Sequence, residues 1–403
     1  MIKKTRLLIT DTAPLYPPRW GGPKRIWGLF SNFTQELFDI TYVGVDCTLA
    51  GNKKYDFNKL QNNFKQISCS FPVHYYPWHI IEKSIIKNPS LDLFAYLRMH
   101  TDWHFKQILN SQKTDILICS HPWSSRAIAK TNSSILIYDA HNCEYLLMEQ
   151  ILKNHFLKRL ILRQVKSLEG RLCQRSDIIL ACSEKEKEDF IGLYGVDPAK
   201  IVIVPNGTNL EKNDTKTKPA CRKDLFLPID DKVIIFVGSY YKPNIDAARF
   251  IIRKVSGELP EFKFLIVGGA SEAFKTQVVP PNIKLLGRVS EEGLTTALRA
   301  SDLAINPMFD GSGVNIKMLD YMAYGLPIVT TECGARGIEI KDRQPMLISS
   351  VEKFSGDIKR ISFDNALYKK MSEDAQALVV KHYGWKIISN RLEEIILEKI
   401  RNN

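Results

Sequence analysis

Residues 302–331 read DLAINPMFDGSGVNIKMLDYMAYGLPIVTT, and this stretch decides the fold class. Its two ends, DLAINP and LPIVTT, are short apolar runs typical of buried strands. Between them lie a glycine-containing loop and an amphipathic segment, 315–324, which stops at Gly325 and Pro327 as helices commonly do. A strand, a helix and a second strand in this order predict a βαβ unit of a parallel sheet.

The same alternation continues along the whole chain on both sides of a polar break at 206–231, which has no hydrophobic period and reads as a linker. The sequence therefore predicts two doubly wound α/β domains, 1–205 and 232–383, whose facing strand ends leave a cleft between them. Residues 384–403 predict a final helix that packs back on the first domain. The predicted strands are 6–10, 39–45, 115–120, 135–140, 177–183, 201–205, 232–239, 262–269, 283–287, 302–307 and 326–331; the predicted helices are 148–175, 184–194, 243–256, 290–300 and 315–324.

Composition and charge limit the class of protein. The 403 residues are 44% hydrophobic and 25% charged, an ordinary composition for a soluble protein. Eight scattered cysteines without C-x-x-C spacing predict reduced thiols in a cytoplasmic protein, and no apolar run is long enough to span a membrane. The net charge of +12 favours an anionic partner, such as a phosphorylated ligand or an acidic membrane surface, although a uniformly basic surface would also explain it.

The loop and helix of 309–327 carry the chemistry. Gly311 and Gly313 let backbone N–H groups approach a ligand at the start of a helix, where phosphate is favoured. Lys317 and Asp320 share one helix face, so they offer a cation and a carboxylate to one place, as a sugar nucleotide requires. The alternative is a plain turn followed by an exposed ion pair worth ~0.3 kcal/mol. The loop matches neither the P-loop nor the G-x-G-x-x-G pattern.

Ordered motifs give the chain a resemblance to a known family. In the second half these are VPNGTN (204–209), IIFVGSYYKPNIDAARF (234–250), FLIVGG (264–269), IKLLGRVSEEGLTTALRASDLAINP (283–307), GSGVNIKMLDYMAYGLPIVTT (311–331) and GARG (334–337). The first half matches more loosely through GGPKRIWGLFSNF (21–33), YDAHNCE (138–144) and ACSEKEKEDF (181–190). Together they resemble the family 4 retaining glycosyltransferases, which implies the GT-B fold: two Rossmann-like domains that face a cleft.

The resemblance implies roles in the loop and helix. The family places two glutamates eight positions apart here. Asp320 falls on the second, the ribose-binding acid, and Ser312 falls on the first, where a carboxylate is missing and Asp310 lies two residues away. The backbone amides of Gly311, Ser312, Gly313 and Val314 are expected to contact the donor sugar.

The resemblance also implies how the rest of the donor is bound. The family's diphosphate-binding arginine falls on Ser239, Lys242 lies nearby, and we expect Lys317 to be the main phosphate cation. Arg288 and Val289 are expected beside the nucleobase.

In the first domain, Gly22 falls in the family's glycine-rich turn near the phosphates. His141 falls beside the donor sugar as a catalytic histidine, unless it is only satisfied by neighbouring backbone. Glu144 is expected to start a helix.

The implied chemistry is transfer with retention, without a protein nucleophile. The chain contains no D-x-D motif, so we expect no essential metal and no cofactor besides the nucleotide-sugar substrate. Segments 14–30 and 74–105 are rich in aromatic side chains, which either pack internally or form a membrane-facing surface for a glycan or lipid-linked acceptor. Membrane association would then be peripheral, at the inner face.

Two other functions stay open. The first is a sugar-nucleotide-binding partner with little transferase activity, because Ser239 and Ser312 stand at charged positions. The second is sugar-nucleotide epimerisation. Nucleic-acid binding ranks last, because it explains the charge but none of the motifs, and we expect no nucleic-acid partner.

Overall fold

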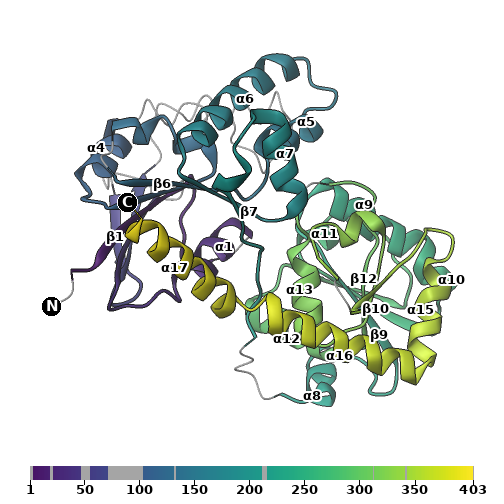
Figure 1. The fold of residues 1–403 in the computed structure, drawn as a ribbon. Helices are drawn as coiled ribbons and strands as arrows, with labels where there is room; N and C mark the ends of the chain where they lie inside the picture. Colours follow the sequence, from purple (N-terminus) through teal and green to yellow (C-terminus); the bar gives the residue numbers. More distant parts are fainter. Residues whose placement is uncertain are drawn as a thin grey trace. The chain divides into compact units, whose positions relative to one another are not determined.

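The computed structural model describes residues 3–18, 21–46, 55–70, 103–130, 133–210, 216–311, 313–340 and 343–402. They divide into two compact units, one formed by residues up to 205 together with 388 onward, the other by 206–387. Each unit is built on a largely parallel sheet with helices, which confirms the predicted α/β class (Figure 1). Segment 71–102, which includes most of the predicted aromatic surface, lies outside the described residues.

The first unit has an eight-stranded sheet within the described residues. In spatial order its strands are β3 (Tyr55–Lys59), β4 (Phe64–Ser70), β2 (Phe38–Asp46), β1 (Thr5–Thr10), β5 (Ile116–Ser120), β6 (Ile135–Asp139), β7 (Ile178–Ala181) and β8 (Ile201–Ile203). All neighbours pair in parallel except the edge strand β3, which runs antiparallel to β4. The strand order reverses between β1 and β5, so the carboxyl ends of these two strands mark a ligand-binding position.

The helices of the first unit fill the connections between the strands. They are α1 (Gly21–Phe30), α4 (Trp103–Ser111), α5 (Glu144–Ile151), α6 (Lys158–Arg175), α7 (Glu184–Tyr194) and the short 3₁₀ turns η3 (Pro122–Ser124), η4 (Ala127–Lys130) and η5 (Pro198–Lys200).

The single helix predicted over 148–175 is two helices. α5 ends at Ile151, and the His155 ring then accepts a hydrogen bond from the Leu157 amide (3.1 Å), which turns the chain into α6.

The second unit has six strands in the order β11 (Ile283–Gly287), β10 (Phe262–Val267), β9 (Lys232–Val237), β12 (Leu303–Asn306), β13 (Ile328–Thr330) and β14 (Met346–Ile348), all parallel within the described residues. Its helices are α8 (Lys218–Asp224), α9 (Lys242–Phe250), α10 (Ser256–Glu258), α11 (Gly269–Glu272), α12 (Glu291–Ala300), α13 (Ile316–Ala323), α14 (Glu332–Ala335), α15 (Phe354–Phe363) and α16 (Asn365–His382), with a π-helical turn, η6 (Ile251–Val255), between α9 and α10.

Alternation along β9 shows how this sheet is covered. Ile234 and Phe236 pack into one core with α9 and α15, whereas Val233 and Ile235 pack into another with α12, α13 and α16. Because successive side chains of a strand point to opposite faces, helices cover both faces of the sheet. The strand order reverses between β9 and β12, and this is the unit's topological switch point.

The predicted linker 206–231 contains a helix of the second unit. Thr217 caps α8, and Arg222 on α8 pairs with Asp302 at 2.6 Å and donates to the carbonyl of Ala300 at 3.0 Å. Composition indicated a linker because the helix is short and its exposed face is charged.

The last helix, α17 (Trp385–Arg401), begins in the second unit and contacts the first. Ser389 donates to the carbonyl of Leu29, and the Glu393 carboxylate accepts from the amide and hydroxyl of Thr34 at 2.8 and 2.6 Å. None of the helices that the structure describes is both long and apolar enough to cross a bilayer.

Candidate active site

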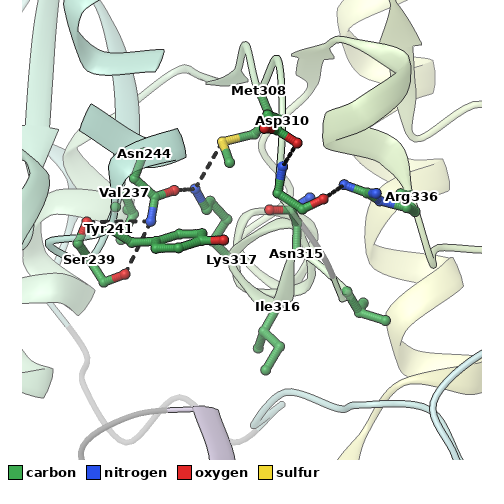
Figure 2. A pocket seen from close by; sticks show the side chains of 13 residues that line it. Val237, Ser239, Tyr241, Asn244, Met308, Asp310, Asn315, Ile316, Lys317 and Arg336 are labelled. Atoms are coloured by element: carbon green, nitrogen blue, oxygen red, sulfur yellow. Dashed lines mark hydrogen bonds between the residues drawn. The ribbon is translucent and has the colours of Figure 1, made fainter. Parts of the chain in front are cut away.

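A cavity of about 250 Å³ lies at the switch point of the second unit. One wall is the carboxyl end of β9 (Val237, Gly238 and Ser239), and the other is the loop after β12 with the start of α13 (Figure 2). Four residues predicted from the sequence line it: Ser239, Gly311, Val314 and Lys317. The structure therefore brings these four together at the place where doubly wound sheets bind ligands.

The loop after β12 adopts a shape that requires glycine. Gly311 and Gly313 have φ of 126° and 73°, and the Asp310 carboxylate accepts from the Gly311 amide at 2.7 Å. Asn315 stands at the N-cap of α13 but does not cap it; its amide group donates to the Gly334 carbonyl instead, at 3.1 Å. The start of α13 thus has no side-chain cap and faces the cavity, which suits an anionic ligand. Ser312 lies outside the described residues.

Lys317 is a cation in a largely neutral setting. Its ammonium donates to Asn244 Oδ1 at 2.7 Å (Figure 2). It also lies 4.7 Å from the centre of the Phe236 ring. Among the described residues no carboxylate lies within ion-pair distance of it. Burial lowers the pKa of Lys317 to about 7. A bound anion would restore the charged form and would gain an interaction with it.

Asp320 forms a hydrogen bond with Thr208. Its Oδ1 accepts from the Thr208 hydroxyl at 2.7 Å, so the two helix-face residues do not form the ion pair that was the alternative interpretation. Tyr324, on the same face, donates to the Thr295 hydroxyl at 3.1 Å. Asp320 is not among the residues that line the cavity.

Three other predicted residues also lie outside the cavity lining. Lys242 is exposed and pairs with Asp246 in its own helix. Arg288 is exposed and lies 3.3 Å from Glu272, and the Val289 side chain is 37% exposed.

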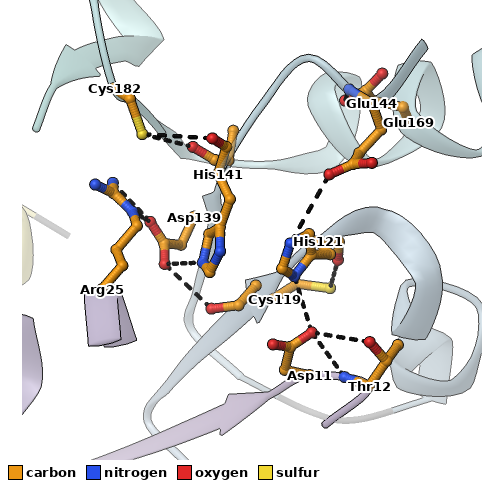
Figure 3. Close-up of polar contacts among 12 residues, drawn as sticks. Asp11, Thr12, Arg25, Cys119, His121, Asp139, His141, Glu144, Glu169 and Cys182 are labelled. Carbon is orange, nitrogen blue, oxygen red and sulfur yellow. Dashed lines mark hydrogen bonds and ion pairs between the residues drawn. The ribbon is translucent and has the colours of Figure 1, made fainter. Parts of the chain in front are cut away.

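In the first unit, Gly22 and His141 lie against each other at the carboxyl end of the sheet. A Cβ atom at Gly22 would lie 3.3 Å from His141 Nδ1, so a larger residue there would require the ring to shift by a few tenths of an ångström. His141 Nε2 lies 3.1 Å from Asp139, which also forms a fully buried ion pair with Arg25 at 2.9 Å (Figure 3). The prediction that His141 faces the Gly311–Val314 loop concerns both units together and stays a prediction.

His121 is a functional candidate that the sequence reasoning missed. It follows β5 at the switch point of this sheet, and its φ of 68° is rare for a residue with a side chain. Its Nδ1 lies 2.9 Å from Asp11, its Nε2 lies 3.8 Å from Glu144, and its ring centre lies 4.1 Å from that of His141 (Figure 3). The sequence did contain a signal for His121, because it follows a predicted strand just as His141 does.

The two histidines have opposite protonation preferences. Burial alone would lower the pKa of His121, but the Asp11 carboxylate outweighs it and raises the pKa to about 9. Burial and the neighbouring His121 charge lower the pKa of His141. Burial also raises the pKa of Glu144 to about 8. The cluster therefore presents a charged imidazolium beside a neutral imidazole.

Asn244 and Arg336 line the cavity of the second unit and were also missed. Asn244 lies in PNIDA, where it resembles an ordinary residue of a helix start. Arg336 lies in GARG, a motif that supported the family resemblance without assigning a role to the arginine. Neither has a spacing signal that would separate it from a surface residue. Within the described ranges, no three His, Cys, Asp or Glu side chains converge in a way that could hold a metal ion.

Two family models match the chain. The one described as Glycosyltransferase Family 4 matches residues 69–212, and the one described as Glycosyl transferases group 1 matches 231–364. The curated D-inositol 3-phosphate glycosyltransferase of Mycobacterium tuberculosis (strain H37Rv) is 25% identical over 185 residues, which are 43% of this chain. The match spans only 38% of that relative's length.

Solved structures match along nearly the whole chain. Sucrose-phosphate synthase from Thermosynechococcus elongatus superimposes with a TM-score of 0.77 at 12% identity, covering 99% of this chain and 100% of that one. Anabaena HepE in complex with UDP and glucose has a TM-score of 0.65 at 13% identity, covering 97% and 98%. The fold is therefore GT-B, and with its two matched domains the chain belongs to the group 1, family 4 glycosyltransferases.

Proposed function

We propose that the protein is a retaining glycosyltransferase that moves a sugar from a nucleotide diphosphate to a hydroxyl of a glycan or lipid-linked glycan. The observation that carries this proposal is Lys317, whose ammonium lies at the switch-point cavity beside an uncapped helix start. It has no carboxylate partner among the described residues. A cation in that position gains most from a ligand with concentrated negative charge, and a diphosphate is such a ligand.

The donor binds along the carboxyl edge of the second sheet. The diphosphate lies against Lys317, and the sugar against the amides of the Gly311–Val314 loop. The ribose binds to Asp320, which Thr208 holds in place. Arg288 and Val289 lie beside the base. A uridine donor is the first choice, because the similar Anabaena HepE is described with UDP and glucose.

Transfer is accelerated by positive charge placed where negative charge develops on the departing diphosphate. The bond between the anomeric carbon and the diphosphate oxygen breaks, and the acceptor hydroxyl forms a new bond on the same face of the sugar. The acceptor proton passes to an oxygen of the departing diphosphate. Lys317 and the α13 start stabilise that diphosphate, and preorganised donors of this type are worth ~3–4 kcal/mol each. The reaction needs no essential metal ion.

The histidine cluster of the first unit lies beside the donor sugar. His141 is the neutral partner, held by Asp139, and it accepts or donates a hydrogen bond to a sugar hydroxyl. His121, which the Asp11 carboxylate keeps charged, adds positive potential beside it. Gly22 leaves room for the His141 ring.

A lipid-linked acceptor is supported by the exposed face of α6. Phe156 and Leu160 are 79% and 56% exposed at its amino-terminal end, and Arg159, Arg163 and Lys166 are exposed along it. The only acidic side chain of α6, Glu169, is buried. Exposed apolar side chains beside unpaired cations are typical of peripheral binding to an anionic bilayer. The protein would then act at the cytoplasmic face of a membrane, in the synthesis of a cell-surface glycan.

A nucleotide-sugar-binding protein with little transferase activity is the second candidate. Ser239 is neutral and Lys242 is engaged with Asp246, so fewer cations reach the diphosphate than the family pattern provides. Slow hydrolysis of the donor in the absence of an acceptor would already count against this candidate.

The deciding experiment has two steps. A thermal-shift screen of nucleotide sugars first identifies the donor, since a ligand at ~100 times its dissociation constant adds ~2.7 kcal/mol of stability. Products formed with that donor and a glycan acceptor are then analysed by NMR for the anomeric configuration. Transfer with inversion, or epimerised donor as the only product, would refute retaining transfer. A His141→Ala variant with the turnover of the unmodified protein would remove His141 from the site.

A further inference from the structure

We infer that Arg336 forms a second anion-binding point in the cavity of the second unit and binds an anionic oxygen of the donor. The inference rests on the proposed function, because it takes the nucleotide sugar to be the ligand of this cavity. It adds to that function a specificity residue on the side opposite Lys317.

Arg336 reaches the cavity from the strand next to the switch point. It follows α14, at the carboxyl end of β13, and lines the cavity together with Lys317 (Figure 2). Its Nη2 donates to the Gly311 carbonyl at 2.5 Å and lies 3.3 Å from the Cys333 sulfur. Its Nε is buried, and in the part of the chain that the structure describes no atom accepts a hydrogen bond from it.

The guanidinium also lacks an ion-pair partner among the described residues. Throughout the described ranges, no carboxylate lies within ion-pair distance of Arg336. Asp310 lines the same cavity, but its Oδ1 accepts from the Gly311 amide. A partly buried guanidinium with an unused donor and no carboxylate is unfavourable unless a ligand supplies the anion. Arginine suits that task because its planar fork binds carboxylates and phosphates through two hydrogen bonds.

Arg336 and Lys317 approach the cavity from different sides of the α13 start. Lys317 points toward β9, where it meets Asn244, whereas Arg336 points toward the Gly311 loop from the β13 side (Figure 2). Such a pair suits a ligand with two separated anionic groups. The second group is either the other phosphate of the diphosphate or a carboxylate on the donor sugar, as in a nucleotide uronate, and the shared chemistry is an anionic oxygen.

A purely structural role predicts something different. If Arg336 only holds the Gly311 loop through its carbonyl, then a polar side chain of similar length should preserve ligand binding. Arg336→Gln keeps an amide donor for that carbonyl but removes the charge, and Arg336→Lys keeps the charge but removes the fork.

The test is calorimetry on the full chain. The probes are inorganic pyrophosphate, a nucleoside diphosphate, and the neutral hexose and hexuronate derivatives of that nucleoside diphosphate. The nucleoside is uridine or guanosine, whichever the unmodified protein binds more tightly as its diphosphate. Arg343→Gln is the matched control, because Arg343 lies in the same unit and pairs with Asp374.

We expect Arg336→Gln to weaken binding about tenfold, Arg336→Lys to weaken it less, and Arg343→Gln to leave it unchanged. A loss with pyrophosphate and with every nucleotide identifies the phosphate as the anion. A loss confined to the hexuronate identifies the sugar carboxylate.

Unchanged dissociation constants for all probes in a folded Arg336→Gln or Arg336→Lys variant would overturn the inference, and so would an unmodified protein that binds no pyrophosphate or nucleotide at millimolar concentration. Arg336-dependent binding without transfer to any acceptor would refute the proposed function and leave this inference standing.

Discussion

At the scale of single residues, the site is defined by charges whose partners are missing or shared. The partner of Lys317 is the neutral side chain of Asn244 instead of a carboxylate. Arg336 has a buried donor, Nε, without an acceptor among the described atoms. By contrast, Arg25 forms a buried ion pair with Asp139 at 2.9 Å in the first unit. A buried pair of that kind is structural, whereas an uncompensated cation at a switch point is prepared for a ligand.

Lys317 makes donor binding depend on pH. Its folded pKa of about 7 lies below the ordinary lysine value, so above pH 7 the free protein loses this charge. A diphosphate binds the protonated form, and binding above pH 7 therefore takes up a proton. We expect nucleoside-diphosphate affinity to fall by up to about tenfold per pH unit from pH 7 to 9. Calorimetry in buffers of different ionisation enthalpy measures both the affinity and the proton uptake.

The matched variant is Lys317→Met, which should bind more weakly at pH 7 and show no such dependence. The same variant should lower kcat about 100- to 1,000-fold and change KM less, because the interaction strengthens as charge develops on the leaving group. An unmodified protein with constant affinity across this range, or Lys317→Met with full kcat, would show that another cation, such as Lys242, binds the phosphate.

Asp320 and Thr208 should act together on the ribose. We expect Asp320→Asn to weaken nucleotide binding about tenfold or more, because a charge-assisted hydrogen bond to a ribose hydroxyl is lost. Thr208→Val removes only the hydroxyl that holds Asp320, so its effect should be smaller and should vanish in the Asp320→Asn background. Calorimetry on the double-mutant cycle checks this. Additive losses would mean that Thr208 acts independently of Asp320.

At the scale of elements, strand and helix types follow from the sequence, but edges and breaks do not. The eleven predicted strands coincide with β1, β2 and β5–β13, because runs of Val, Ile and Leu bounded by turn residues leave little choice. The edge strands β3 and β14 and the inner strand β4 were missed, since YDFNK and FKQISCS are mixed polar segments whose strand character depends on their neighbours. The π-helical turn at 251–255 has no sequence signal either.

The positions of several site residues were predictable from the order of the strands, but their side-chain contacts were not. Loops after predicted strands located Lys317, Gly311, Ser239 and His141, because the carboxyl ends of parallel strands converge. What the side chains do there was not predictable. Tertiary packing decides that Lys317 turns to Asn244, that Asp320 turns to Thr208 and that Lys242 turns to Asp246.

The exposed face of α6 should bind anionic vesicles. Burial and the charge of Arg171, which lies on α6, lower the pKa of Arg126. We expect Arg159→Glu with Arg163→Glu to reduce binding to phosphatidylglycerol vesicles about 30-fold, at ~1 kcal/mol per cation removed. Co-sedimentation at low and high salt measures this, and binding should weaken as salt screens the charges.

The control for α6 is Lys369→Glu with Lys370→Glu, an exposed basic pair on α16 of the second unit. Phe156→Ser with Leu160→Ser tests the apolar contribution and should weaken binding at every salt concentration. Equal losses from the α6 and α16 charge reversals would mean that net charge, and not this face, governs vesicle binding.

At the scale of the whole molecule, one helix joins the two units along the chain. α17 starts in the second unit, where the Trp385 amide donates to the Thr208 carbonyl at 3.2 Å, and it continues into the first, where Glu393 is 8% exposed. Glu393, near the end of the sequence, is therefore buried in the unit that contains the start of the sequence. Variants at this end should separate the stability of the first unit from ligand binding in the second.

Glu393→Ala is the variant that separates them. The substitution removes the carboxylate that accepts from both the amide and the hydroxyl of Thr34, and hydrogen bonds to a charged group contribute about 1.5–3 kcal/mol. We expect the unfolding free energy of the first unit to fall by about that amount, while nucleoside-diphosphate affinity stays unchanged. Urea unfolding followed by hydrogen exchange assigns the loss to a unit, and calorimetry reports the affinity.

Glu394→Ala is the matched control, because the neighbouring Glu394 is exposed on the same helix and should change neither quantity. Parallel losses of stability and nucleotide affinity in Glu393→Ala would show that the two units unfold together and that this helix couples them.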